Sequence, residues 1–208
     1  MTSARLTAQS FITYVNTDYA RSRGLEFEFR KRIGKWFNGQ ASFSYAIATG
    51  KSSSSEEGVL IARGDLEESI REEYLAWDRP ITASLSLNFF AQKGSFGIGE
   101  EIIDNWSLYL RGFYQSGKRY TPAVFTGSID EEGRKEYESV QGEYNTGIAD
   151  DWFYIDLNFE KYFDLSGLSF SVFLEVNNLL DNKNSTIINP VTGRAYDYGD
   201  DVPSSFND

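Results

Sequence analysis

Hydrophobic and polar residues alternate along six stretches of this chain. In residues 24–33, the apolar side chains of Leu25, Phe27 and Phe29 alternate with charged ones. The other five stretches are residues 40–48, 81–89, 106–115, 153–160 and 168–177. Strict alternation over eight or more residues predicts a β-strand with one apolar face. A weaker pattern at residues 6–15 brings the prediction to about seven strands and an all-β fold class.

The lengths of these strands and of their connections narrow the fold class further. Strands of about 9–12 residues exceed the usual ~5–6 and match the ~9–11 residues with which a tilted strand crosses a bilayer. Residues 34–39 and 164–167 form short connections, and residues 93–105 an intermediate one. Long polar stretches lie at residues 50–76, 117–150 and 182–208. Short turns at one end and long loops at the other predict an antiparallel meander that is part of a transmembrane β-barrel wall.

Each predicted strand has one apolar and one polar face. In a wide barrel the polar face lines a wet lumen, whereas in a soluble β-sandwich it faces solvent, and a small filled barrel would bury the charges at several kcal/mol each. We expect the apolar side chains on the convex face of a curved sheet. The apolar set is Phe27, Phe43, Leu85, Leu108, Leu157 and Val172, and the charged set is Glu26, Glu28, Arg30, Arg32, Asp156, Glu160 and Glu175.

Aromatic residues gather near the predicted strand ends. Trp and Tyr favour the membrane interface, which suits their apolar body and polar tip. The alternative is a set of aromatic residues that cap the core of a sandwich. We expect an aromatic girdle made of Trp36, Phe37, Trp77, Trp106, and Trp152 with Tyr154.

Composition excludes several classes of function. A formal charge of −11 argues against a nucleic-acid partner, which requires clustered Lys and Arg. The chain has no Cys and no His, so disulfides, the usual zinc sites and the commonest general base are missing. No apolar run approaches the ~20 residues of a transmembrane helix. We expect no cofactor.

Two groups of acidic residues are candidates for chemical sites. Glu26 and Glu28 lie two apart on a strand, a separation that a glycosidase pair could use, but any strand with two Glu offers it. Asp197, Asp200 and Asp201 could bind Ca²⁺. Their spacing lacks the EF-hand order, which favours a hydrated acidic loop. We expect no enzymatic activity.

Four segments, in order along the chain, carry a family resemblance. They are Asn16-Thr-Asp-Tyr-Ala-Arg-Ser-Arg-Gly24-Leu-Glu26, Trp77-Asp-Arg79-Pro80, Tyr114-Gln-Ser-Gly117-Lys-Arg-Tyr120-Thr-Pro122 and Val176-Asn-Asn-Leu179-Leu-Asp181-Asn, and Asn189-Pro190-Val-Thr-Gly193-Arg194 follows. Together they resemble the C-terminal barrel strands of TonB-dependent outer-membrane receptors. Gly24 allows a close backbone approach, Pro80 suits a strand start, and Asn178 and Asp181 suit the exit of a strand.

The resemblance implies a function and a set of partners. It implies a segment, residues 1–208, of an importer in the bacterial outer membrane, with the plug domain and the final strand outside this chain. The partners would be outer-membrane lipid, a plug domain and the TonB energising complex. The cargo would be a siderophore, cobalamin or an oligosaccharide, contacted by outer loops 50–76, 117–150 and 182–208. The alternative is a secreted β-sandwich module that binds carbohydrate or protein.

Overall fold

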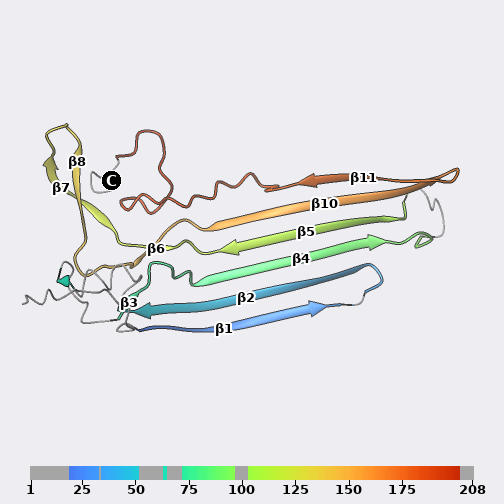
Figure 1. Cartoon of the computed structure of the whole chain (residues 1–208), viewed down its shortest axis with the longest axis horizontal. Coiled ribbons are helices and arrows are strands. Elements are labelled where there is room, and N and C mark those ends of the chain that lie inside the picture. The colour runs from blue at the N-terminus through green and yellow to red at the C-terminus, as the bar shows by residue number, and fades with distance from the viewer. Residues whose placement is uncertain (1–18, 33, 52–62, 65–71, 97–102, 202–208) are drawn as a thin grey trace, which may run out of the picture.

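The long strands form a single antiparallel sheet (Figure 1). In this computed structural model, residues 19–32, 34–51, 63–64, 72–96 and 103–201 are described. Six strands are long. They are β1 (Ala20–Lys31), β2 (Phe37–Gly50), β4 (Ile81–Ala91), β5 (Trp106–Gln115), β10 (Trp152–Leu165) and β11 (Leu168–Val176).

Each long strand pairs with its sequence neighbours, in the order β1-β2-β4-β5-β10-β11. The two-residue strand β3 (Glu73–Tyr74) adds to the end of β2. This confirms the predicted meander of long strands. The predicted strand at residues 6–15 lies outside the described residues.

The short connections all lie at one end of the sheet and the long ones at the other (Figure 1). Between β10 and β11 the turn is only Ser166 and Gly167, which both have positive φ (49° and 86°). That combination is a type I′ turn, which matches the twist of the flanking strands. The predicted asymmetry of turns and loops is therefore confirmed.

The register places the predicted apolar residues on one face. Phe27 lies opposite Phe43, which lies opposite Ala83, and Leu108 lies between Phe89 and Phe159. This face is exposed: Phe27 is 63% accessible and Phe29 71%. In the described part of the chain no second sheet packs on it, so the sandwich alternative is wrong.

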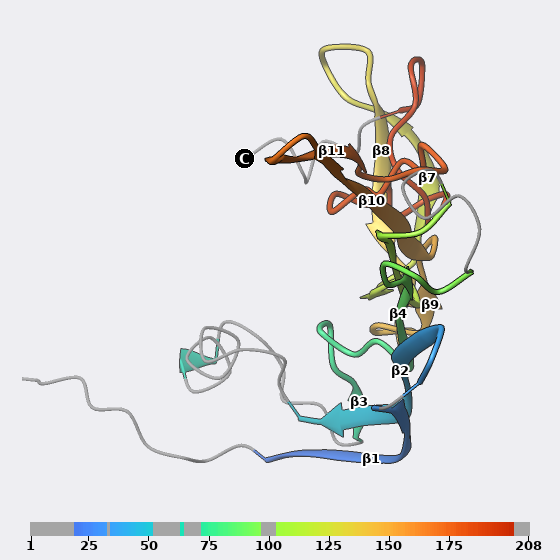
Figure 2. The ribbon, with the colours of Figure 1, turned by 90° about the vertical axis from the view of Figure 1, so that its right-hand side faces the viewer.

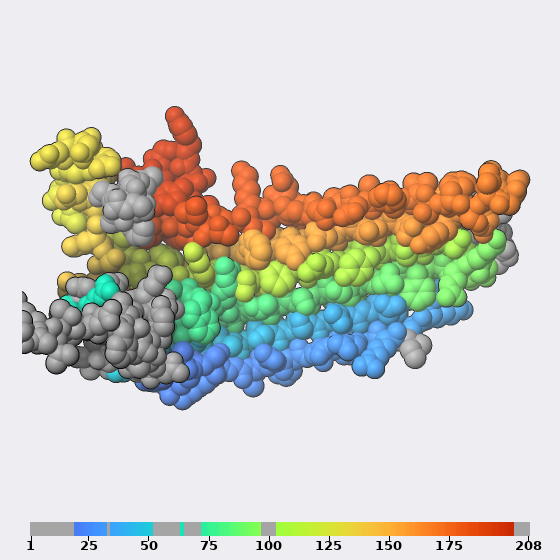
Figure 3. Space-filling view, viewed as in Figure 1, coloured from blue at the N-terminus to red at the C-terminus, as the bar shows by residue number. Residues whose placement is uncertain are grey.

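The sheet is curved, and its apolar face is the convex one. Figure 2 shows the arc end-on, with β1 and β11 bending to the same side. One hydrogen bond shows which face each side chain takes: Ala46 N–H donates to the Pro80 carbonyl. In a strand of L-residues, the direction of the chain and the direction of the N–H together fix where the side chain points. Here they place the Ala46 side chain on the concave side. Since side chains alternate, Tyr45 and Ile47 point to the convex side. Figure 3 shows the concave side as a continuous wall.

The loop between β5 and β10 contains structure that the sequence pattern did not predict. Strands β7 (Ala123–Ile129) and β8 (Lys135–Ser139) form a hairpin, and β6 (Arg119–Tyr120) pairs with β9 (Gly147–Ile148). Four of the five buried apolar residues lie at this long-loop end: Ala48, Leu75, Ala123 and Ala149. Among the described residues, burial of apolar side chains is thus concentrated at the long-loop end rather than along the middle of the long strands.

None of the described residues forms a helix with the length and apolarity that crossing a membrane requires.

Candidate functional site

The concave face is a polar wall. In the register of the six long strands it carries two arginines, Arg30 and Arg111, and a larger number of acidic residues. The acidic residues are Glu26, Glu28, Asp156, Glu160, Asp164 and Glu175. Arg30 forms an ion pair with Glu28, and the hydroxyls of Ser42 and Ser84 lie 2.7 Å apart across two strands. Arg32 follows the end of β1 rather than lying within the strand.

Three aromatic side chains interrupt this polar wall near its long-loop end. Phe113 stacks on Tyr154 with ring centroids 5.5 Å apart, and Trp152 meets both rings edge-on at 5.8 and 6.1 Å. Trp152 pairs in register with Gln115, and Tyr154 with Phe113, so all of them share the concave face. We call Phe113, Trp152 and Tyr154 the aromatic platform.

The prediction of an interface girdle is wrong for the two platform residues Trp152 and Tyr154. Trp152 and Tyr154 do not face the convex side, because each alternates with an apolar neighbour, Phe153 or Ile155, that does. Trp106 lies on the convex face, where its ring is 6.3 Å from that of Phe159. Trp36, in the turn after β1, stacks on Phe96 at 5.1 Å.

The platform is flanked by polar groups that are not used elsewhere. The Arg111 guanidinium lies 5.7 Å from the centre of the Tyr154 ring. Within the described residues, the Tyr154 hydroxyl and the Trp152 indole N–H have no hydrogen-bond partner. Ring faces with free polar tips can bind a ligand that is itself partly apolar and partly hydroxylated.

A buried ion pair joins two of the sequence motifs. Arg119 Nε lies 2.9 Å from Asp78 Oδ2, and their side chains are 7% and 3% exposed. Asp78 Oδ1 also accepts a hydrogen bond from Ala48 N–H at 2.8 Å, and the guanidinium stacks on the Tyr74 ring at 3.8 Å. The pair therefore fastens the loop before β4 and the loop after β5 to the end of β2.

Small residues and a proline complete this junction. Ile81 N–H donates to Ser116 Oγ, and Ser116 N–H to the Ile81 carbonyl. At Gly117 an added Cβ would lie 1.8 Å from the Ala149 carbonyl oxygen, and at Gly24 2.2 Å from that of Tyr45. Pro80 directly precedes β4, as the sequence predicted. These motif residues hold the backbone in place.

In the segment after β11, side-chain amides make the hydrogen bonds to β10 that a paired strand would otherwise make. Asn184 accepts from Phe153 N–H at 3.0 Å and donates to the Phe153 carbonyl at 2.8 Å, as a partner strand would. Asn178 has φ of 52°, and its side chain bonds the backbone of Asn182. The predicted role of Asn178 at the strand exit is confirmed.

The next turn docks on the loops. Gly193 N–H donates to the Asn189 carbonyl, Ala123 N–H to the Pro190 carbonyl, and Asp150 N–H to the Gly193 carbonyl. Asn189 is only 2% exposed. The turn after β11 is thereby hydrogen-bonded to Ala123 at the start of β7 and to Asp150, just before β10.

The three candidate calcium ligands bind cations of the chain itself. Asp201 contacts Lys135 at 2.7 Å, and Arg194 lies 3.5 Å from both Asp197 and Asp200. The hydrogen bond from Lys135, with one from Tyr137, holds the pKa of the Asp201 carboxyl below its usual value. Among the described residues, no group of three or more acidic residues is arranged to hold a metal ion.

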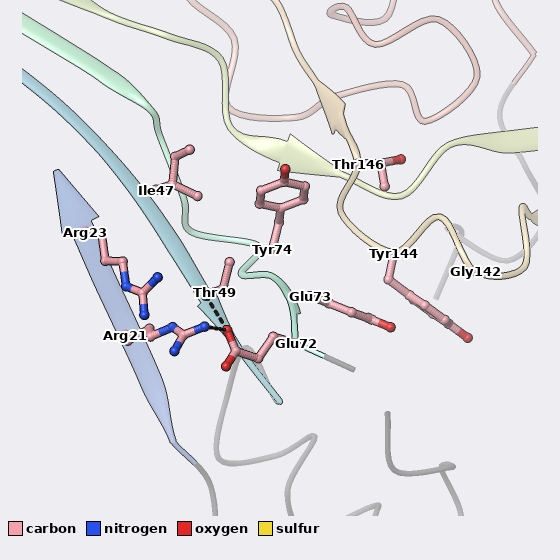
Figure 4. Close-up of a pocket in the computed structure, with 10 residues that line it drawn as sticks. All are labelled: Arg21, Arg23, Ile47, Thr49, Glu72, Glu73, Tyr74, Gly142, Tyr144 and Thr146. Carbon is pink, nitrogen blue, oxygen red and sulfur yellow. Dashed lines mark hydrogen bonds and ion pairs between the residues drawn. The ribbon is translucent and has the colours of Figure 1, made fainter. Parts of the chain in front are cut away.

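A pocket opens on the convex face at the long-loop end (Figure 4). It has a volume of about 520 Å³ and is lined by Arg21 and Arg23 of β1, Ile47 and Thr49 of β2, Glu72, Glu73 and Tyr74, and Gly142, Tyr144 and Thr146 of the loop before β9. Arg21, Arg23, Ile47 and Thr49 alternate in phase with Leu25 and Phe27, so the pocket lies on the apolar side of the sheet.

Hydrogen bonds fix one side of this pocket. Glu72 pairs with Arg21, accepts from the Tyr19 hydroxyl at 2.8 Å and from the Thr49 hydroxyl at 3.0 Å. The bond from Tyr19 holds the pKa of the Glu72 carboxyl below its usual value, and the same bond raises the pKa of Tyr19. Arg23 has no hydrogen-bond or ion-pair partner among the residues that the structure describes.

The structure separates the sequence candidates. Parts of outer loops 117–150 and 182–208 pack together, and Tyr74 of loop 50–76 contacts Asn145 and Arg119 of loop 117–150. Residues 52–62, 65–71 and 202–208 lie outside the described part. Sequence reasoning missed the Asp78–Arg119 pair, because nothing in two separate motifs indicates that their charges meet. It could have found the platform from alternation alone.

The sequence matches the family model described as TonB dependent receptor-like, beta-barrel, over residues 2–179. No curated protein and no solved structure matches the chain. The family is an outer-membrane transporter family and not an enzyme family, and the antiparallel meander of long strands fits its β-barrel. This chain belongs to the TonB-dependent receptor-like β-barrel family.

Proposed function

We propose that this chain is a wall segment of an importer through which an oligosaccharide crosses the outer membrane. The observation that carries the proposal is the aromatic platform on the polar face of the sheet. The concave face lines the lumen, with the family's plug and the TonB complex supplying gating and energy. Outer loops 50–76, 117–150 and 182–208 make the first contacts with the cargo.

The charge of the wall favours an oligosaccharide over an anionic iron–siderophore complex. The six acidic residues of the concave face outnumber its two arginines, which repels an anionic iron–siderophore complex. Sugar rings present C–H groups that stack on aromatic faces, and hydroxyls that reach Tyr154, Trp152 and Arg111.

Uptake measurements on the complete receptor test this proposal. Tyr154→Ala and Trp152→Ala should each weaken saccharide uptake about threefold to tenfold, since an aromatic contact contributes ~0.5–1.5 kcal/mol beyond its area. Phe173→Ala is the control. Phe173 also lies on the concave face, but on β11 and away from the platform. Uptake of a ferric siderophore, with no response to a panel of oligosaccharides, would refute the proposed cargo class.

A further inference from the structure

The charges of the concave face are unevenly distributed. All six of its acidic residues belong to β1, β10 and β11. Strands β2 and β4, both described over their full length, contain no charged residue, and their concave face presents mainly hydroxyls and amides. This uncharged strip begins beside the aromatic platform, where Ser84 pairs in register with Phe113, and runs to Asn38 and Asn88 at the short-turn end.

A second pocket, of about 360 Å³, lies where the uncharged strip reaches the short-turn end. Its lining includes Asn38 and Gln40 of β2, Ser86 and Asn88 of β4, and Tyr109 of β5. In register, Asn88 lies between Asn38 and Tyr109, and Gln40 lies opposite Ser86. These five side chains therefore share the concave face, on the same side of the sheet as the platform.

The polar groups of this pocket are available to a ligand. Within the described residues, the side-chain amides of Asn38, Gln40 and Asn88 have no hydrogen-bond partner. Each amide can donate and accept, so it can bind neighbouring hydroxyls of a sugar. The Tyr109 hydroxyl lies 3.3 Å from Ser86 Oγ, and Tyr109 is 40% exposed, which leaves its ring accessible to the C–H face of a sugar.

Basic side chains border the second pocket on its β1 side. Arg30 forms an ion pair with Glu28, and the Lys31 ammonium lies 3.7 Å from the centre of the Phe37 ring. Arg32, just beyond the end of β1, adds N–H donors that sugar hydroxyls accept. Among the described residues that line the pocket, none is acidic. The pocket thus suits an uncharged, hydroxylated ligand, while the acidic residues of β10 and β11 disfavour an anion on the same path.

The spacing of the two sites suits a chain of sugars. Tyr109 and Phe113 are four residues apart on β5 and face the same side, which places them about 13 Å apart along the strand. An oligosaccharide of a few rings spans this distance and can touch the pocket before it leaves the platform. A path with more than one weak site lets a cargo enter and leave without a single deep trap.

We propose that the second pocket is an inner saccharide site, which receives a neutral oligosaccharide from the platform once the plug has moved. The Tyr109 ring carries one sugar, and the amides of Gln40 and Asn88 bind its hydroxyls. The inference rests on the proposed function, because it concerns a later step in the import of the same cargo.

Binding and uptake by cells that carry the complete receptor test the inner site. The probes are labelled neutral glucans, mannans, xylans and fructans, from disaccharides to hexasaccharides. Binding is measured in cells without active TonB, and saturated uptake in cells with it. Tyr109→Ala and the double variant Gln40→Ala/Asn88→Ala should bind like the wild type without TonB. Their saturated uptake should fall about threefold to tenfold, as expected for loss of a hydrogen bond or ring contact at an intermediate site.

Three further variants locate the effect. Trp152→Ala, in the platform, should weaken both binding and uptake. Tyr109→Phe keeps the ring and should recover most of the uptake that Tyr109→Ala loses. Asn158→Ala is the matched control, because Asn158 carries the same amide at the same level of the wall but lies on β10, outside the pocket. It should import like the wild type. Normal binding without TonB also shows that each variant is folded in the membrane.

The outcomes separate the inner site from the proposed function. If Trp152→Ala loses uptake but both pocket variants import like the wild type, the inner site is wrong and the proposed function stands. If the wild type takes up none of the oligosaccharides, both are wrong. An equal loss in Asn158→Ala would also overturn the inner site. So would entry of vancomycin into cells of the double variant without active TonB, because the amides would then seat the plug.

Discussion

At the scale of single residues, alternation decides which environment each side chain meets. Leu85 and Ser84 are neighbours on β4, yet Leu85 lies in register with Ala41 and Gly112 on the convex face, and Ser84 bonds Ser42 on the concave face. A change of one position in sequence is therefore a change from lipid to lumen.

Substitution of these two neighbours by arginine should have very different effects. Leu85→Arg places a charge near the middle of the lipid-facing strand, where it costs about 2–4 kcal/mol, whereas a lumen position tolerates the charge. Heat-modifiable gel mobility of the complete receptor should show a lower unfolding temperature for Leu85→Arg than for Ser84→Arg. Equal mobility shifts would contradict the assigned faces.

Alternation predicts the face of some residues correctly, but contacts with neighbouring segments change the environment of others. Alternation placed Leu85, Leu108 and Val172 on one face because their strands are regular. Alternation alone puts Trp152 and Tyr154 on the concave face, whereas their proximity to a strand end suggests an interface girdle and gives the wrong face. Lys161 shows the reverse problem: it has the phase of the apolar face, but its ammonium donates to the Asp104 carbonyl, so it is only 7% exposed.

At the scale of elements, one buried ion pair connects three loop and strand segments. Asp78 belongs to the loop before β4, Arg119 to β6 and Ala48 to β2. The sequence predicted the strands that these segments follow but not their junction, since contacts between loops have no periodic signal. The β7–β8 hairpin is not predicted from sequence, although Asp130 and Gly133 mark its turn, because its short strands lie in a predominantly polar stretch without a long alternating pattern.

Removal of one partner of this pair should be worse than removal of both. Arg119→Met leaves the Asp78 charge buried and should cost about 3–5 kcal/mol, and Asp78→Asn should likewise be costly. The double variant has no lone charge and should recover part of the loss. Protease cleavage of loops 117–150 in intact cells, compared across the three variants, measures the effect. If the increase in cleavage of the double variant equals the sum of the increases in the two single variants, the two residues are not energetically coupled.

The contact between Lys135 of β8 and Asp201 should depend on pH. The pKa of Asp201 is lowered and that of Lys135 is raised, each chiefly by their mutual hydrogen bond. The contact is therefore fully present above the unfolded pKa of the Asp, near 3.8, and below that of the Lys, near 10.5. It should be lost as pH falls through the folded pKa of Asp201, or rises through that of Lys135.

Protection of residues 196–201 from limited proteolysis, followed across pH, should show this loss. Lys135→Gln removes the cation and should abolish the dependence at the acidic end. Lys183→Gln is a control in the same outer region. Unchanged protection down to pH values well below 3.8 in the unaltered receptor would exclude the contact as the cause.

At the scale of the whole molecule, the sheet of the described residues is open. β1 pairs only with β2, and β11 only with β10, so both edges present unpaired backbone groups within the described part. Curvature, order of strands and asymmetry of loops all followed from sequence, because each depends on local patterning. Closure of the sheet into a barrel depends on which strands pair with β1 and β11. The alternation of residues within a strand does not specify these partners.

The last prediction follows from this open sheet: the 208-residue chain, produced alone, should associate rather than remain a monomer. Unpaired strand edges are templates for association in water, and in lipid or detergent each unsatisfied backbone group costs several kcal/mol. The exposed apolar face adds to this, since Phe27, Phe29 and Val172 are each more than half accessible. Closure of these strands into a small barrel is unfavourable, because Glu26, Glu28 and Asp156 would then be crowded into a narrow interior. Size-exclusion chromatography with light scattering, with and without detergent, measures the outcome. A monodisperse species near 23.6 kDa in water, with a cooperative melting transition, would show that the convex face is a protein core and not a lipid surface.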